Sequence, residues 1–180
     1  MDEVARVVST AFTVSNDLRR DTEVVLLFGG TEGKVDGGRR IVVHGARVRY
    51  LNPDERSTAA LLKNALTRAI AHPRDFESSP GLVVGPIDGR AELARLAGEP
   101  RGVWLTESGA SWESLGVLGP DRTFFLSDPY DPTDEEVAVL RAANLPAISV
   151  GPRSLRASQV VDVVHHLLDV AAEGGPNPPV

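Results

Sequence analysis

The sequence contains no cysteine among its 180 residues. A disulfide framework, a Cys-ligated zinc, an iron-sulfur site and a thiol nucleophile are therefore all excluded. No apolar run approaches the roughly 18 residues that a membrane span needs, and the first residues, MDEV, have neither the basic nor the apolar region of a signal peptide. We therefore expect a soluble, cytoplasmic protein without a membrane partner.

Several catalytic signatures are also missing. No G-x-S-x-G and no G-x-G-x-x-G pattern occurs, so nothing supports a hydrolase or a dinucleotide-binding enzyme. The loop GGTEGK at residues 29–34 is one residue short of a phosphate-binding loop, and Val35 stands where a metal-binding hydroxyl would be needed. His165 and His166 point about 100° apart on a helix, which favours structural histidines. We expect no metal site.

The charges are unevenly distributed along the chain. Up to Arg74 there are 12 basic and nine acidic residues, a balance of +3, whereas the remainder has seven basic and 16 acidic residues, a balance of −9. A net acidic protein can still bind a polyanion through a local basic patch, because phosphate contacts act within about 8 to 10 Å. The alternative is that these charges are dispersed and solvated.

The first half begins with apolar residues spaced three and four apart, which predicts an opening helix. EVVLLF at residues 23–28 is typical of a buried strand. Residues 39–50 predict two short strands around a turn, with Arg47 and Arg49 on one face. A helix is expected from Asn52, as its N-cap, to about His72.

The second half alternates strands and helices. Strands are expected at residues 82–84, 102–105, 123–127 and 147–150, and helices at 91–97, 133–144 and 158–172. The helix at 133–144 is expected to start with a capping box formed by Thr133 and Glu136. The buried side of the last helix is expected to carry its apolar residues, Val160, Val161, Val164, Leu167 and Leu168. The prediction is an α/β fold with a mainly parallel sheet and helices on both faces. Residues 1–172 are expected to form a single domain, and the Gly- and Pro-rich residues 173–180 a disordered tail. Ligands of parallel sheets bind at the carboxyl ends of strands, and three of these ends are polar.

Two segments are specific enough to indicate a family: DLRRD at residues 17–21 and VRYLNPDERSTAALLK at residues 48–63. They resemble the archaeal tRNA pseudouridine N1-methyltransferases and their bacterial relatives. Weaker agreement follows at Leu105, Glu107 and Gly109, at FFLSD (124–128), at ISVGPRS (148–154) and at VHHLLD (164–169), so the resemblance covers almost the whole chain. The family has a further segment, beginning with a strand, before the first helix, and we expect that strand to be missing here.

The resemblance implies a SPOUT-type methyltransferase with a C-terminal trefoil knot, an S-adenosylmethionine site in the knot and a homodimer. The implied cofactor-binding residues are Leu105, Ser127, Ser149, Val150, Gly151, Pro152, Arg153, Ser154, Leu155 and Val160. Two of them depart from the family pattern, which commonly has Gly in place of Ser127 and Cys in place of Val160. Contacts made by the backbone would survive both changes.

The implied reaction is methylation of N1 of pseudouridine in the T-loop of tRNA (position 54). This base is joined to its ribose through carbon, so N1 keeps a hydrogen that the enzyme must remove while it aligns the methyl group. Asp17, Asp54 and Asp128 are the carboxylates that could accept this proton or orient the base, and Arg56 is a further catalytic candidate. Asp54 is equally well explained by the helix dipole. The residues expected to hold RNA phosphates are Arg19, Arg20 and Arg56.

Two alternative functions remain open at this stage. The chain could be a bacterial-type homologue that acts on a different RNA or nucleoside, or a non-catalytic dimeric RNA-binding protein. Cofactor titration separates the enzyme from the binding protein, and RNA mass spectrometry separates the targets.

Overall fold

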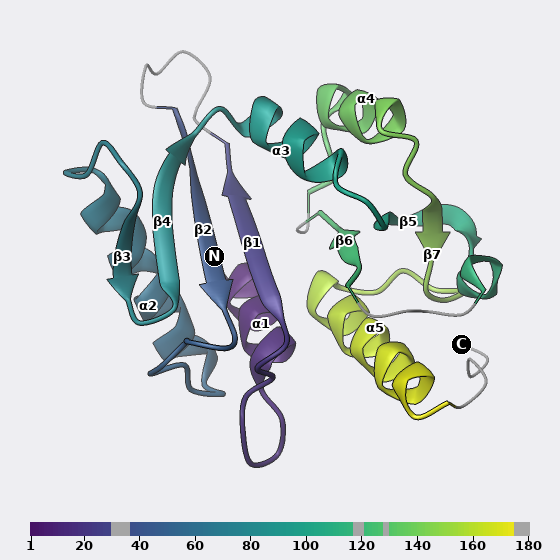
Figure 1. Ribbon diagram of the computed structural model, residues 1–180, viewed down its shortest axis with the longest axis horizontal. Helices are drawn as coiled ribbons and strands as arrows, with labels where there is room; N and C mark the ends of the chain where they lie inside the picture. Colours follow the sequence, from purple (N-terminus) through teal and green to yellow (C-terminus); the bar gives the residue numbers. More distant parts are fainter. Residues whose placement is uncertain (30–36, 117–120, 128–129, 175–180) are drawn as a thin grey trace. The chain divides into compact units, whose positions relative to one another are not determined.

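Figure 1 shows the computed structural model, which describes residues 1–29, 37–116, 121–127 and 130–174. The chain divides into two compact units, Met1–Leu93 and Ala94–Val180. The single domain expected over residues 1–172 stays a prediction. The loop residues 30–34, Asp128 and tail residues 175–180 lie outside the described ranges.

The first unit contains a four-stranded antiparallel sheet. Its strands are β1 (Glu23–Phe28), β2 (Gly38–His44), β3 (Phe76–Ser79) and β4 (Leu82–Ile87), in the order β1-β2-β4-β3. The predicted mainly parallel sheet is wrong for this unit. A parallel pair needs a crossover of a dozen or more residues, whereas two residues join β3 to β4 and nine join β1 to β2.

Two helices, α1 (Asp2–Phe12) and α2 (Glu55–Ala69), lie behind this sheet in Figure 1 and pack against each other. The register pairs Ile41 with Val84 and Val43 with Leu82, so these four buried side chains share one face. Val8 and Phe12 of α1 and Leu62 of α2 are buried as well; a large apolar side chain contributes about 1.5 to 3 kcal/mol when buried. Both helices lie on the same face of this sheet (Figure 1), whereas the sequence predicted helices on both faces.

Several predicted boundaries in this unit are wrong. The helix α2 begins at Glu55 with Asp54 as its N-cap, because the carbonyl of Asn52 accepts a hydrogen bond from Thr58 Oγ1 at 3.2 Å instead of starting the helix. Residues 48–50 form no strand, since Tyr50 has a left-handed backbone (φ 64°) that ends extended structure. The strand β3 was not expected.

The second unit holds the parallel sheet. Its strands β5 (Gly102–Ser111), β6 (Thr123–Phe125) and β7 (Ala147–Ser149) are arranged in the order β6-β5-β7, and both pairs are parallel as predicted. The helix α3 (Gly89–Ala97) precedes β5, and a 3-10 turn, η1 (Trp112–Leu115), follows it. The helix α4 (Asp134–Ala142) begins with the predicted capping box between Thr133 and Glu136, and α5 (Ala157–Ala172) is the last helix.

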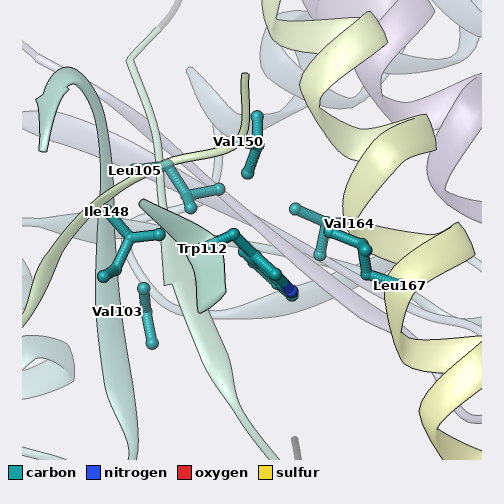
Figure 2. Close-up of a cluster of buried hydrophobic side chains, with 7 residues drawn as sticks. All are labelled: Val103, Leu105, Trp112, Ile148, Val150, Val164 and Leu167. Carbon is teal, nitrogen blue, oxygen red and sulfur yellow. The ribbon is translucent and has the colours of Figure 1, made fainter. Parts of the chain in front are cut away.

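The core of the second unit lies between this sheet and α5 (Figure 2). Its buried residues are Val103, Leu105, Trp112, Ile148, Val150, Val164 and Leu167. The Trp112 ring stacks on Phe124, with 6.0 Å between the ring centroids. Val164 and Leu167 come from the face of α5 that the apolar spacing predicted, and Leu168 packs against the same cluster. No helix within the described ranges is long and apolar enough to cross a membrane.

Candidate functional site

Polar residues of all three strands follow their buried residues toward one edge of the parallel sheet. Trp104 of β5 is opposite both Phe125 of β6 and Ala147 of β7. Two residues further along each strand, the chain reaches Thr106, Ser127 and Ser149. Because parallel strands all end at the same edge, these residues stand together at the position where α/β sheets bind ligands. The topology brings the predicted residues to one edge, and a ligand site there stays a prediction.

An irregularity in β5 shapes this edge. Leu105 and Ala110 are both opposite Ile148, so residues 106–109 leave the regular pairing between them. Gly109 makes this possible, because a Cβ atom there would lie 2.5 Å from the Ile148 amide nitrogen. The four residues form a bulge within β5, and pairing with β7 resumes at Ala110 and Ser111.

Glu107 stands in this bulge, and its Oε1 accepts a hydrogen bond from Ser154 Oγ. Both side chains are exposed. Glu107 was not among the predicted site residues. The signal that could have identified it was the polar run TESG directly after the buried residues of β5, in the stretch that carries the family resemblance.

The predicted cofactor-binding residues after β7 form a loop, residues 149–155, which we call the cofactor loop. Ser149 Oγ donates a hydrogen bond to the carbonyl of Gly151 at 2.9 Å, which turns the chain sharply after the strand. Val150 is buried, and Leu155 and Val160 pack against the same apolar cluster. Pro152, Arg153 and Ser154 are exposed. The loop therefore has an apolar inner side and a polar rim.

Asp54 has a structural role that its assignment as a catalytic candidate did not include. Its carboxylate accepts a hydrogen bond from the Ser57 amide at 2.8 Å and caps the first turn of α2. The neighbouring Glu55 accepts a hydrogen bond from Arg6 Nε at 2.8 Å, and this pairing raises the pKa of the Arg6 guanidinium.

Asp17 is brought together with Arg20. The Asp17 carboxylate accepts hydrogen bonds from the Leu18 amide at 2.7 Å and from Arg20 Nη2 at 3.4 Å. The backbone bond and then the Arg20 charge lower the pKa of Asp17, because both stabilise its ionised form. Asp17 is therefore a carboxylate at neutral pH, and a weaker base than an ordinary aspartate.

The three predicted RNA-binding arginines differ in their surroundings. Arg20 Nη1 donates to the carbonyls of Gly45 and Val48, both at 3.1 Å, so part of its guanidinium is used within the fold. Arg19 is half-buried, and its amide donates to the Phe12 carbonyl at 2.7 Å. Arg56 is exposed at the start of α2, and within the described ranges its side chain has no hydrogen bond or ion pair.

The candidate residues thus divide between the units. Asp17, Asp54 and the three arginines belong to Met1–Leu93, whereas every predicted cofactor-binding residue belongs to Ala94–Val180. Within the described residues, no group of three or more His, Asp or Glu side chains is placed to hold a metal ion.

Comparisons with known proteins agree with one another. A family model described as "Putative SAM-dependent RNA methyltransferase" matches residues 1–172. The tRNA (pseudouridine(54)-N(1))-methyltransferase of Methanosarcina mazei is 37% identical over 179 residues, which cover 99% of this chain and 82% of that protein. Its counterpart from Methanopyrus kandleri is 40% identical over 172 residues, or 94% of this chain and 79% of that protein.

A solved structure is similar in fold. The crystal structure of Archaeoglobus fulgidus Nep1 bound to S-adenosylhomocysteine matches with a TM-score of 0.66 at 16% sequence identity. The match covers 96% of this chain and 71% of that chain. At this identity the likeness concerns the fold.

Proposed function

Because this chain belongs to the SAM-dependent RNA methyltransferase family and is closely related in sequence to archaeal tRNA (pseudouridine(54)-N(1))-methyltransferases, we propose that it methylates N1 of pseudouridine 54 in the T-loop of tRNA. The observation that carries this proposal is the edge of the β6-β5-β7 sheet. Three strand ends, a bulge with a carboxylate and a loop with an apolar inner side meet there.

The residues at this edge fit S-adenosylmethionine chemically. The adenine ring needs an apolar slot with backbone donors and acceptors beside it, and Leu105, Val150 and Leu155 offer apolar side chains next to the backbone of Gly151. Glu107 provides an exposed negative charge that complements a cationic ligand. Ser127 and Val160, where the family commonly has Gly and Cys, keep their backbone groups, so the departures leave such contacts possible.

In the proposed reaction the bound cofactor supplies an electrophilic methyl group on a sulfonium. The residues of this chain hold the two reactants. The apolar side of the cofactor loop positions the adenosyl part, and Glu107 favours the cationic end. In the first unit, Arg56 is free to pair with an RNA phosphate, because no described residue uses its guanidinium. Placement of the two reactants, more than covalent help, is the main contribution expected of such a site.

The proton of pseudouridine N1 needs an acceptor, and the carboxylates of the first unit differ in suitability. Asp54 is engaged as a helix cap, and the lowered pKa of Asp17 makes it a weak base. We therefore assign Asp17 to positioning, through Arg20, and propose that the N1 proton leaves to solvent water as N1 gains the methyl group. The catalytic roles of Asp17, Asp54 and Arg56 stay predictions.

The proposal includes a SPOUT-type trefoil knot formed by the C-terminal segment, a homodimer and a cytoplasmic location. The likeness in fold to Archaeoglobus fulgidus Nep1 supports the SPOUT architecture. The apolar residues of α5 support a dimer, because Val160, Val161 and Leu168 stay partly exposed on one helix. Light scattering at high protein concentration tests the dimer, since a monomer mass would contradict it.

The test of the reaction uses purified protein, radiolabelled S-adenosylmethionine and a T-loop hairpin carrying pseudouridine at position 54. A matched hairpin with uridine at that position is the control. We expect transfer to the first hairpin alone, and mass spectrometry of its nucleosides should identify 1-methylpseudouridine. Transfer to another nucleotide would favour the homologue with a different target. Tight RNA binding without any transfer would favour the non-catalytic binding protein.

A further inference from the structure

A pocket in the first unit lies outside the predicted cofactor site. It has a volume of about 560 Å³, and its lining includes Arg20, Arg47, Arg49, Glu77, Pro80 and Gly81. The pocket is an open hollow of the surface and not an enclosed cavity. Ligand sites are usually apolar, whereas three of the side chains here are arginines. The lining chemistry therefore favours an anion.

The backbone around the pocket is held in place by specific contacts. Arg20 bridges the carbonyls of Gly45 and Val48, and the Arg49 amide donates to the Pro80 carbonyl at 3.2 Å. Gly81 has a positive φ of 78°, and a Cβ atom there would lie 2.3 Å from the Val48 amide nitrogen. Only glycine permits this close approach without strain. The backbone segments that carry the arginines of the pocket are therefore fixed by contacts within the fold.

The charge in the pocket is not balanced. Arg47 is paired with Glu77 at 3.8 Å, and both side chains are about half exposed, so the pair is weak. Glu77 Oε1 also accepts a hydrogen bond from the Gly81 amide at 2.8 Å. Within the part of the chain that the structure describes, the Arg49 guanidinium has no hydrogen bond or ion pair. Arg20 pairs with Asp17 and Arg47 with Glu77, so the positive surplus of the pocket comes from Arg49.

We propose that this pocket holds a backbone phosphate of the RNA through Arg47 and Arg49, with Arg20 supporting the backbone beneath them. The guanidinium fork matches phosphate oxygens. Tyr50, next to Arg49 in the chain, is 75% exposed, and an exposed ring beside a cationic groove is typical of single-stranded nucleic-acid sites. This inference rests on the proposed function, because it takes the RNA substrate as the source of the phosphate. It adds two arginines to those predicted from the sequence.

The test compares Arg47→Ala, Arg49→Ala and Glu77→Gln, with Arg141→Ala on the last turn of α4 as the matched control. The affinity for the T-loop hairpin is measured across salt concentrations. Each lost phosphate contact should lower the magnitude of the salt slope by about 0.7 to 0.9. Glu77→Gln should tighten binding at low salt by about two- to fivefold, because the amide oxygen can still accept from Gly81 while the competing charge is gone.

A phosphate site predicts weaker RNA binding in Arg47→Ala and Arg49→Ala but tighter binding in Glu77→Gln. A merely structural role of these residues does not predict this difference. If Glu77→Gln weakens binding, or if Arg47→Ala and Arg49→Ala behave as the control does, the proposal is overturned. Thermal melts of each variant check that folding is unchanged. Inorganic phosphate is the probe for the source of the anion. If Arg49→Ala loses phosphate binding but keeps its RNA affinity, the pocket binds a free anion and the proposal is overturned.

Failure of the pocket and failure of the proposed function give different results. Methyl transfer by the parent protein together with unchanged RNA binding in the arginine variants contradicts the pocket alone. No methyl transfer by the parent protein, with reduced salt slopes in the variants, contradicts the enzyme and supports the pocket.

Discussion

Ser154 donates a hydrogen bond to the carboxylate of Glu107, although 47 positions separate them in the chain. The bond joins the bulge within β5 to the cofactor loop that follows β7, both within the second unit. Each partner is exposed, so the carboxylate is accessible to a ligand as well as to the hydroxyl. The pair therefore shapes the edge of the sheet at which we propose that the cofactor binds.

The first prediction concerns the charge of Glu107. Glu107→Gln keeps an acceptor for Ser154 but removes the negative charge. It should therefore weaken binding of S-adenosylmethionine, whose sulfonium is cationic, about two- to tenfold. Binding of S-adenosylhomocysteine, whose sulfur is uncharged, should weaken less. Calorimetry with both ligands measures the difference, and Glu113→Gln on η1 is the control. Equal losses for the two ligands would remove the electrostatic role from Glu107.

A second prediction concerns Gly109. A methyl group at this position would meet the backbone of β7 at 2.5 Å, so Gly109→Ala should lower the free energy of unfolding by about 1 to 3 kcal/mol. Cofactor affinity should fall as well, because the bulge must move. Gly89→Ala is the control, since a Cβ atom there meets nothing within 4 Å. Urea denaturation that gives the two variants the same stability would contradict this account.

The capping role of Asp54 leads to a third prediction. Asp54→Ala should cost about 0.5 to 2 kcal/mol of stability, whereas Asp54→Asn, which retains a capping oxygen, should be nearly neutral. The asparagine variant should also keep methyl transfer within a few-fold of the parent. A well-folded Asp54→Asn protein that loses transfer more than about a hundredfold would instead place the carboxylate in the chemistry.

The fourth prediction follows from the lowered pKa of Asp17. A carboxyl whose pKa is lower in the folded protein stabilises the fold above its unfolded pKa, near 3.8, and loses this contribution as the pH falls through the lowered folded value. Asp17→Asn should therefore be slightly less stable than the parent at pH 7, and the difference should shrink as the pH falls below about 3.8 and vanish below the lowered folded pKa. Urea denaturation across this range measures it. A difference that does not change with pH would show that the charge of Asp17 does not matter.

Local patterns predicted the elements whose contacts are local. The Thr133 and Glu136 capping box is present as expected, because its partners are three residues apart. The strand β1 has the predicted bounds. At α2 the local pattern predicted Asn52 as the cap, whereas Asp54 caps the helix in the structure. Asn and Asp are both good capping residues, so the local pattern does not distinguish them. The bond from Thr58 to the Asn52 carbonyl accompanies a helix that begins only at Glu55.

The sequence by itself determined the family, the reaction class that the family implies and the polar strand ends at which a cofactor is expected, because these depend on residue identity along short stretches. Tertiary structure alone decided the antiparallel pairing of the first sheet, the bond between Glu107 and Ser154 and the gathering of Arg20, Arg47 and Arg49 around one pocket. The physical reason is that hydrophobic periodicity reports which side chains are buried and which hydrogen bonds are local. It does not report which distant backbones approach each other, and that approach builds both sites.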